Sequence, residues 1–204
     1  MTYPHVLQSF SPPGAPQLSA WELAQFQKPY IHEAAHAVVA RLTGYPVKWV
    51  SVDQSFIDAD PEAIERGCAG IGPTCMTLSS EKLKPVLDRG FFLTKDERQS
   101  ILGYVMHVLA GPIAECRFDD KSFDEEVGNR DFEQVQMVLA LCSPDKRQRK
   151  DLYKIAYRQL DRLLDERWSS IISVANALVK RQTLYGHEID ELVASDAPSM
   201  REAV

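Results

Sequence analysis

The sequence predicts a mainly α-helical domain with one small β element. Apolar residues recur at helical spacing over most of the chain, whereas alternation with a period of two is confined to a segment near residues 47–52. Prolines and glycines separate the helical stretches. Hydrophobic residues make up 45% and charged residues 25% of the 204 residues, which is typical of a globular chain and excludes a disordered or fibrous one.

The N-terminal part of the pattern predicts two helices followed by a strand. Ser19 is suited to cap a short helix over 19–26. Pro29 is expected to begin a second helix, because the first helical position does not need its N–H. Apolar residues then continue at helical spacing to Leu42, and Gly44 is a suitable stop. The β-branched and aromatic residues of 47–52 alternate and predict a strand.

The rest of the chain predicts a loop and a series of helices. Residues 53–78 contain three glycines and are expected to form an extended loop, with a second short strand near Gly70. Helices are expected over 79–90, 95–118, 129–142, 145–182 and 187–194. Gly111-Pro112 predicts a kink or break, an acidic loop is expected over 119–128, and a further break is expected near Trp168.

The chain shows no internal repeat and no linker, so we expect one domain over 19–196. The first eighteen residues hold four prolines and little apolar pattern, which predicts an irregular arm over 1–18. A mobile tail is expected over 197–204.

Charge and cysteine content exclude several classes of protein. Lys+Arg 23 against Asp+Glu 29 gives a net charge of −6, which does not favour nucleic acid or an anionic membrane surface as a partner. Neither an apolar run of membrane-spanning length nor a secretory signal is evident. The sparse cysteines, without a CxxC pair, predict reduced thiols in a cytoplasmic protein, with a bridge or metal pair of Cys68 and Cys75 as the alternative.

The strongest motif is an HExxH sequence formed by His32, Glu33 and His36. Residues four apart lie on one face of a helix, so both imidazoles can bind one ion. Glu33 is suited to be the general base that takes a proton from the metal-bound water. The side chains around the motif are apolar, and buried polar groups of this kind need a partner. The motif therefore predicts a Zn²⁺ site.

A catalytic zinc ion needs a third protein ligand and leaves its fourth position to water. The composition alone offers Glu115, Asp124, Glu125, Glu126, Asp131 and His107. No EXXXD or HExxHxxGxxH pattern follows the motif, so a thermolysin-like or metzincin site lacks support. His107 lies in an apolar helical pattern, which is more typical of a core histidine.

Five segments also occur in a familiar order. They are YIHEAAHAVVA at 30–40, PVKWVSV at 46–52, VLAGPIAE at 108–115, GNRDFEQV at 128–135 and QTLYGHEI at 182–189. They resemble the HEAGHA helix, the following strand, the GGRxAEE helix, the GAxxDLxxAT segment and the ETLxGEEI tail of the FtsH-type zinc metallopeptidases, the protease half of membrane-bound AAA proteases. From the first to the last, they span most of residues 29–195.

This resemblance implies an FtsH-peptidase-like helical domain in which Asp131 is the third zinc ligand. It implies that Glu115 lies nearby, as a group that orients a ligand histidine. It also implies that the strand over 47–52 can pair with an extended substrate, and that the chain can form a homo-oligomer. The sequence has no GxxxxGK[ST] motif, so we expect no ATPase activity and a need for a separate ATPase or for accessible peptides.

The leading hypothesis is a cytoplasmic zinc endopeptidase that acts on a protein or peptide. One alternative is a non-proteolytic zinc-binding interaction module or partner of a separate ATPase. Another is a regulatory protease with one dedicated protein target. Two other features are interpreted as solvent-exposed. His187 and Glu188 begin a helix but lack the second histidine of an HExxH motif. The basic run over 146–150 is interpreted as an exposed helix face, with a docking patch for a partner as the alternative.

Overall fold

The computed structural model describes residues 20–59, 74–76, 94–119 and 129–196. The elements are α1 (Ala20–Leu42), β1 (Val47–Ser51), α2 (Gln54–Ala59), β2 (Thr74–Met76), α5 (Lys95–Asp119), α6 (Asn129–Cys142), α7 (Lys146–Arg181), β3 (Thr183–Tyr185) and α8 (Gly186–Ser195). A mainly helical chain with a small β element is thus confirmed. The predictions for 1–18, 79–90, 120–128 and 197–204, and those for Cys68 and Gly70, lie outside the described residues.

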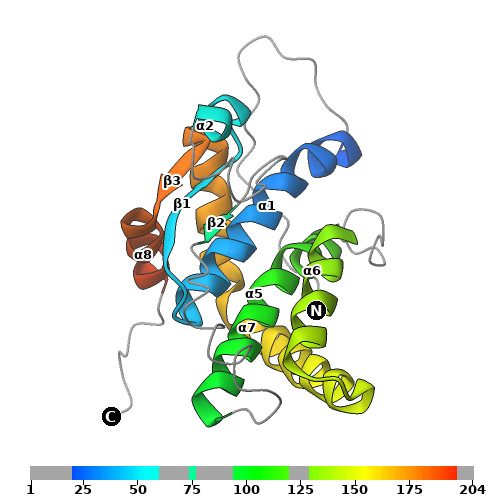
Figure 1. Cartoon of the computed structure of the whole chain (residues 1–204). Coiled ribbons are helices and arrows are strands. Elements are labelled where there is room, and N and C mark those ends of the chain that lie inside the picture. Colours follow the sequence, from blue (N-terminus) through cyan, green and yellow to red (C-terminus); the bar gives the residue numbers. More distant parts are fainter. Residues whose placement is uncertain (1–19, 60–73, 77–93, 120–128, 197–204) are drawn as a thin grey trace, which may run out of the picture.

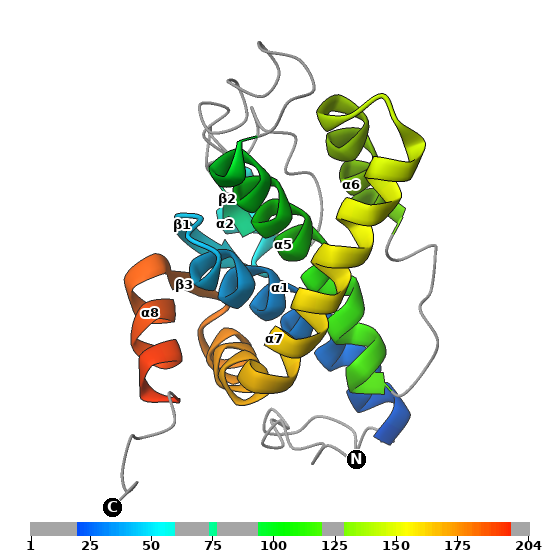
Figure 2. The same cartoon turned by 90° about the horizontal axis from the view of Figure 1, so that it is seen from below.

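Helix α1 is the central element (Figure 1). The sheet and α8 lie against one side of it, α5 and α6 lie on the other, and α7 contacts both α1 and α5 (Figures 1 and 2). The side chains from Glu33 to Ala40 are buried on every face of α1. A helix that is apolar nearly all round belongs in the interior, so the HExxH motif lies inside the core and not on the surface.

Helix α1 corrects one prediction about its start. It is a single helix from Ala20, and Pro29 lies inside it instead of beginning a second helix. The missing N–H of one proline removes one hydrogen bond, whereas packing of the residues that follow stabilises the whole element. The predicted stop is confirmed, because Gly44 has a φ of +82° and the Tyr45 N–H donates to the Ala40 carbonyl at 2.8 Å.

The β element is a three-stranded antiparallel sheet in the order β2-β1-β3. Val50 of β1 is opposite Thr74 of β2 and opposite Leu184 of β3. Both sides of β1 are therefore paired, and the expectation that this strand receives a substrate strand is wrong. Only β2 and β3 remain as edges in the described part of the sheet.

Two further predictions need correction. Helix α2 occupies part of the expected loop, where the Asp53 carboxylate accepts a hydrogen bond from the Ser55 N–H at 2.9 Å and Ile57 is buried. Helix α5 continues through Gly111-Pro112, so of the predicted kink or break, the break is wrong. The break in α7 is confirmed, because Arg167 has non-helical angles beside Trp168.

None of the helices described here is long and apolar enough to cross a membrane.

Candidate metal centre

Three side chains from two helices converge at one point in the core. His32 and His36 are one turn apart on α1, and their Nε2 atoms are 2.9 Å from each other. Asp131, in the first turn of α6, brings its Oδ2 to 3.4 Å from the His32 Nε2 and 3.7 Å from the His36 Nε2. One atom from each of the three residues lies within 4.8 Å of the other two, although the sequence separates Asp131 widely from the motif.

The hydrogen bonds of the two rings determine where their protons lie. The His36 Nδ1 is 2.8 Å from the carbonyl oxygen of His107, which can only accept, so this nitrogen must carry the hydrogen. The His32 Nδ1 is 2.6 Å from a carboxylate oxygen of Glu115 and donates to it. In their neutral forms both rings therefore direct the lone pair of Nε2 toward Asp131. Two lone pairs and a carboxylate cannot share this space without a cation.

A zinc ion fits this arrangement. With bonds of about 2.0–2.1 Å, two ligands of a tetrahedral zinc ion are about 3.3 Å apart. The three distances here, 2.9, 3.4 and 3.7 Å, lie on both sides of that value. Ligand histidines in metal sites also donate their second ring N–H to a carboxylate or a backbone carbonyl, and Glu115 and His107 provide one of each.

The electrostatics of the site also favour a cation. Burial lowers the pKa of His32, but its contacts with Asp131 and Glu115 and the charge of Glu33 outweigh burial and raise this pKa to about 10. Burial opposes the charge of Asp131, yet its contacts with His32 and His36 hold the pKa of its carboxyl well below the usual range. Without a metal ion, the His32 Nε2 therefore holds a proton where the ion would lie.

This proton predicts a pH dependence of metal binding. Because His32 is protonated below a pKa of about 10, a metal ion has to displace one proton near neutral pH. We expect the affinity for Zn²⁺ to rise by about tenfold per pH unit between about pH 6 and pH 8. Titration against a fluorescent zinc chelator, calibrated at each pH, measures this slope. A flat profile would contradict the raised pKa of His32 in the metal-free protein.

His107 supports the site without being part of it. Its ring is buried, and its Nδ1 is 3.0 Å from the carbonyl oxygen of His36, so the two histidines bond to each other's backbone. Burial lowers the pKa of His107 to about 3, and the ring is neutral at physiological pH. His107 is not one of the three residues whose atoms converge, and its position agrees with its interpretation as a core histidine.

The sequence reasoning missed the role of Gly111. A Cβ at this position would lie 2.4 Å from the His36 Nε2 and 2.7 Å from the His32 Nε2. Only glycine therefore lets the backbone of α5 come this close to both ring nitrogens. The signal was the spacing: His107, Gly111 and Glu115 are four residues apart and share one face of α5.

A second missed contact holds α6 against α5. The Gln134 side-chain amide donates to the Tyr104 hydroxyl at 2.6 Å, less than one turn from Asp131. Burial raises the pKa of Tyr104 far above its usual range, so it stays a neutral phenol. This bond fixes the first turns of α6, and with them the carboxylate of Asp131.

The structure does not describe three of the remaining candidates. Asp124, Glu125 and Glu126 lie outside the described residues. His187 is exposed and stacks on Tyr185, as expected for a solvated helix start. Cys142 is buried as a free thiol.

A comparison with protein-family models and with curated proteins found no match for the chain.

Proposed function

We propose that the chain is a zinc-dependent endopeptidase that resembles the peptidase domain of the FtsH-type proteases. The observation that carries the proposal is the convergence of two imidazole lone pairs and one carboxylate on a single point. His32, His36 and Asp131 would hold Zn²⁺, and Glu115 would orient the ring of His32. Zinc, when bound, would lower the pKa of its water and polarise the scissile carbonyl.

Glu33 is the general base in this proposal. It follows His32 on α1, its charge helps to raise the pKa of the His32 ring, and it is 4% exposed, so it is largely shielded from bulk water. It would take a proton from the attacking water and then give it to the leaving amine. A purely structural zinc site would not need this carboxylate.

Two features favour catalysis over structural zinc. Structural sites usually have four protein ligands, often cysteines, whereas three residues without cysteine converge here in the described part of the chain. The side chains of His32 and Asp131 are also 15% and 22% exposed, so the site keeps some contact with solvent. We propose a protein or peptide as the substrate and the cytoplasm as the location, in keeping with the free thiol of Cys142.

Elemental analysis tests the metal site directly. We expect about one zinc per wild-type chain, and a loss of most of it in Asp131→Ala, because two histidines alone bind zinc weakly. Asp151→Ala, at an exposed position of α7, is the control and should keep its zinc. Unchanged zinc in Asp131→Ala would assign the third ligand to another residue. No zinc in the wild type, even after zinc is supplied, would refute the proposal.

A further inference from the structure

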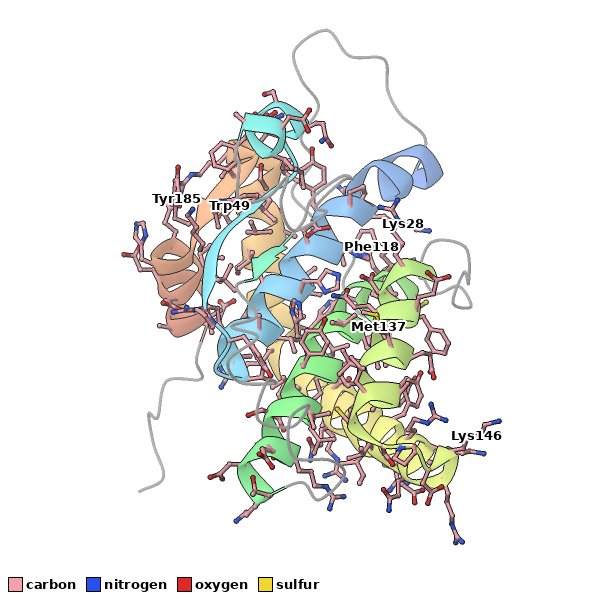
Figure 3. All side chains as sticks on the ribbon, viewed as in Figure 1. Lys28, Trp49, Phe118, Met137, Lys146 and Tyr185 are labelled. Carbon is pink, nitrogen blue, oxygen red and sulfur yellow. The ribbon has the colours of Figure 1, made fainter. Side chains whose placement is uncertain are left out.

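A second feature lies on the outer side of α6 and α7. A hollow of about 360 Å³ lies between these helices and is lined by Gln136, Leu139, Lys146, Arg149, Lys150 and Tyr153. We call it the α6–α7 groove. Lys146, the first residue of α7, lies at one end of this groove (Figure 3).

The groove has a positive end. Lys146, Arg149 and Lys150 lie on one face of the first turns of α7. Within the described part of the chain none of the three forms an ion pair, whereas Arg117 of α5 is paired with Asp161 and Asp165 farther along α7. Three like charges on one hollow repel one another, and an anionic partner would relieve that repulsion.

The other end of the groove is aromatic. Tyr153 follows the cations on the same face of α7, with ring centroids 6.1 Å from Phe132 and 6.3 Å from Tyr157. Phe132 is 38% and Tyr157 is 42% exposed, so both rings are accessible to a partner. Phe132 and Tyr157 therefore adjoin Tyr153, which lines the hollow.

The aromatic end includes Phe132, which is next in sequence to Asp131 of the candidate metal centre. Leu139, which lines the hollow, lies eight residues after Asp131 on α6. At 1.5 Å per residue, this separation is about 12 Å. An extended peptide covers it with about four residues.

We infer that the α6–α7 groove docks an acidic peptide segment that also carries an aromatic or aliphatic side chain, and that this segment belongs to the substrate protein. The acidic residues would pair with Lys146, Arg149 and Lys150, and the apolar side chain would pack on Tyr153 and its neighbours. A small inorganic anion would leave the aromatic end unused. That the segment belongs to a substrate rests on the proposed peptidase function, whereas its binding to the groove does not.

Binding is tested without hydrolysis. The probe is a fluorescein-labelled acidic peptide that contains phenylalanine, measured by fluorescence anisotropy on the Glu33→Gln protein. We expect the triple variant Lys146→Glu, Arg149→Glu, Lys150→Glu to lose at least about tenfold in affinity, and Tyr157→Ala to lose severalfold. A matched triple variant, Arg147→Glu, Arg158→Glu, Arg162→Glu, changes the charge of α7 equally on a different face and should bind normally.

Several outcomes would overturn the inference. Equal loss in both triple variants would mean non-specific attraction, and a peptide with glutamine in place of its acids that binds equally well would exclude charge recognition. Complete competition by inorganic phosphate together with an unaffected Tyr157→Ala would mean a simple anion site. Zinc content and circular dichroism of each variant separate these results from misfolding. Peptide binding in a protein that hydrolyses no substrate would refute the peptidase function alone.

Discussion

Glu33→Gln is expected to reduce peptide hydrolysis by about 10³-fold while leaving zinc bound. Glutamine keeps the size of the buried Glu33 side chain but cannot take a proton from water. The residues that converge on the metal, His32, His36 and Asp131, are unchanged in this variant. Loss of activity with full zinc content would therefore separate the chemistry of the general base from the binding of the metal.

The measurement is hydrolysis of fluorescent casein by zinc-loaded protein, with elemental analysis of the same samples. Glu133→Gln removes one negative charge at an exposed position of α6 and should leave the rate unchanged. A Glu33→Gln protein that cleaves casein at the wild-type rate would exclude Glu33 as the base. Absence of cleavage in the zinc-loaded wild type, with accessible peptides as well as casein, would contradict the endopeptidase proposal.

Gly111→Ala is expected to remove most of the bound zinc and the activity that depends on it. The new Cβ would lie 2.4 Å from the His36 Nε2 and 2.7 Å from the His32 Nε2, closer than non-bonded atoms approach. Both rings would have to turn, and each ring is held by a hydrogen bond at its Nδ1. Alanine in place of glycine in a helix would otherwise stabilise it by about 1 kcal/mol, so lost zinc with retained helicity would identify a local effect.

Gly103→Ala is the matched control for this variant. It is on the same helix, and its Cβ would meet the nearest atoms at 3.2 and 3.3 Å, on Thr43 and Tyr45 rather than on the histidines. These contacts are tight, and we expect a modest change in stability with normal zinc content. A Gly111→Ala protein with zinc and activity like the wild type would mean that the rings do not need this approach of α5.

The sequence predicted the long helices well because their signal is local and repeated. The range 129–142 agrees with α6, and the break near Trp168 agrees with the irregular Arg167. Short elements were predicted less well. Strand β3 was not predicted, because its three residues are too few for an alternating pattern and it is stabilised by pairing with β1. Pro29 was misleading because a local rule for prolines does not include the packing of the whole helix.

For the candidate site, the two histidines and Glu33 could be proposed from their spacing alone, because one helix carries them all. Asp131 could not be chosen by composition among several acids, since nothing local specifies which one reaches the motif. It was selected by the resemblance to a known family, and the structure brings its carboxylate to both rings. Gly111 was interpreted as a helix breaker, because a residue without a side chain carries no chemical signal of its own.

The paired backbone bonds of His36 and His107 have a consequence for the order of assembly. Each ring donates to the carbonyl of the other residue, so the two bonds form together only in one relative position of α1 and α5 along their axes. A shift of either helix by one residue would break both. The two bonds use the Nδ1 atoms and backbone carbonyls and leave the His36 Nε2 for a metal, so they do not require an ion. Metal loading would then be a late insertion into a finished helix pair, rather than the event that brings the helices together.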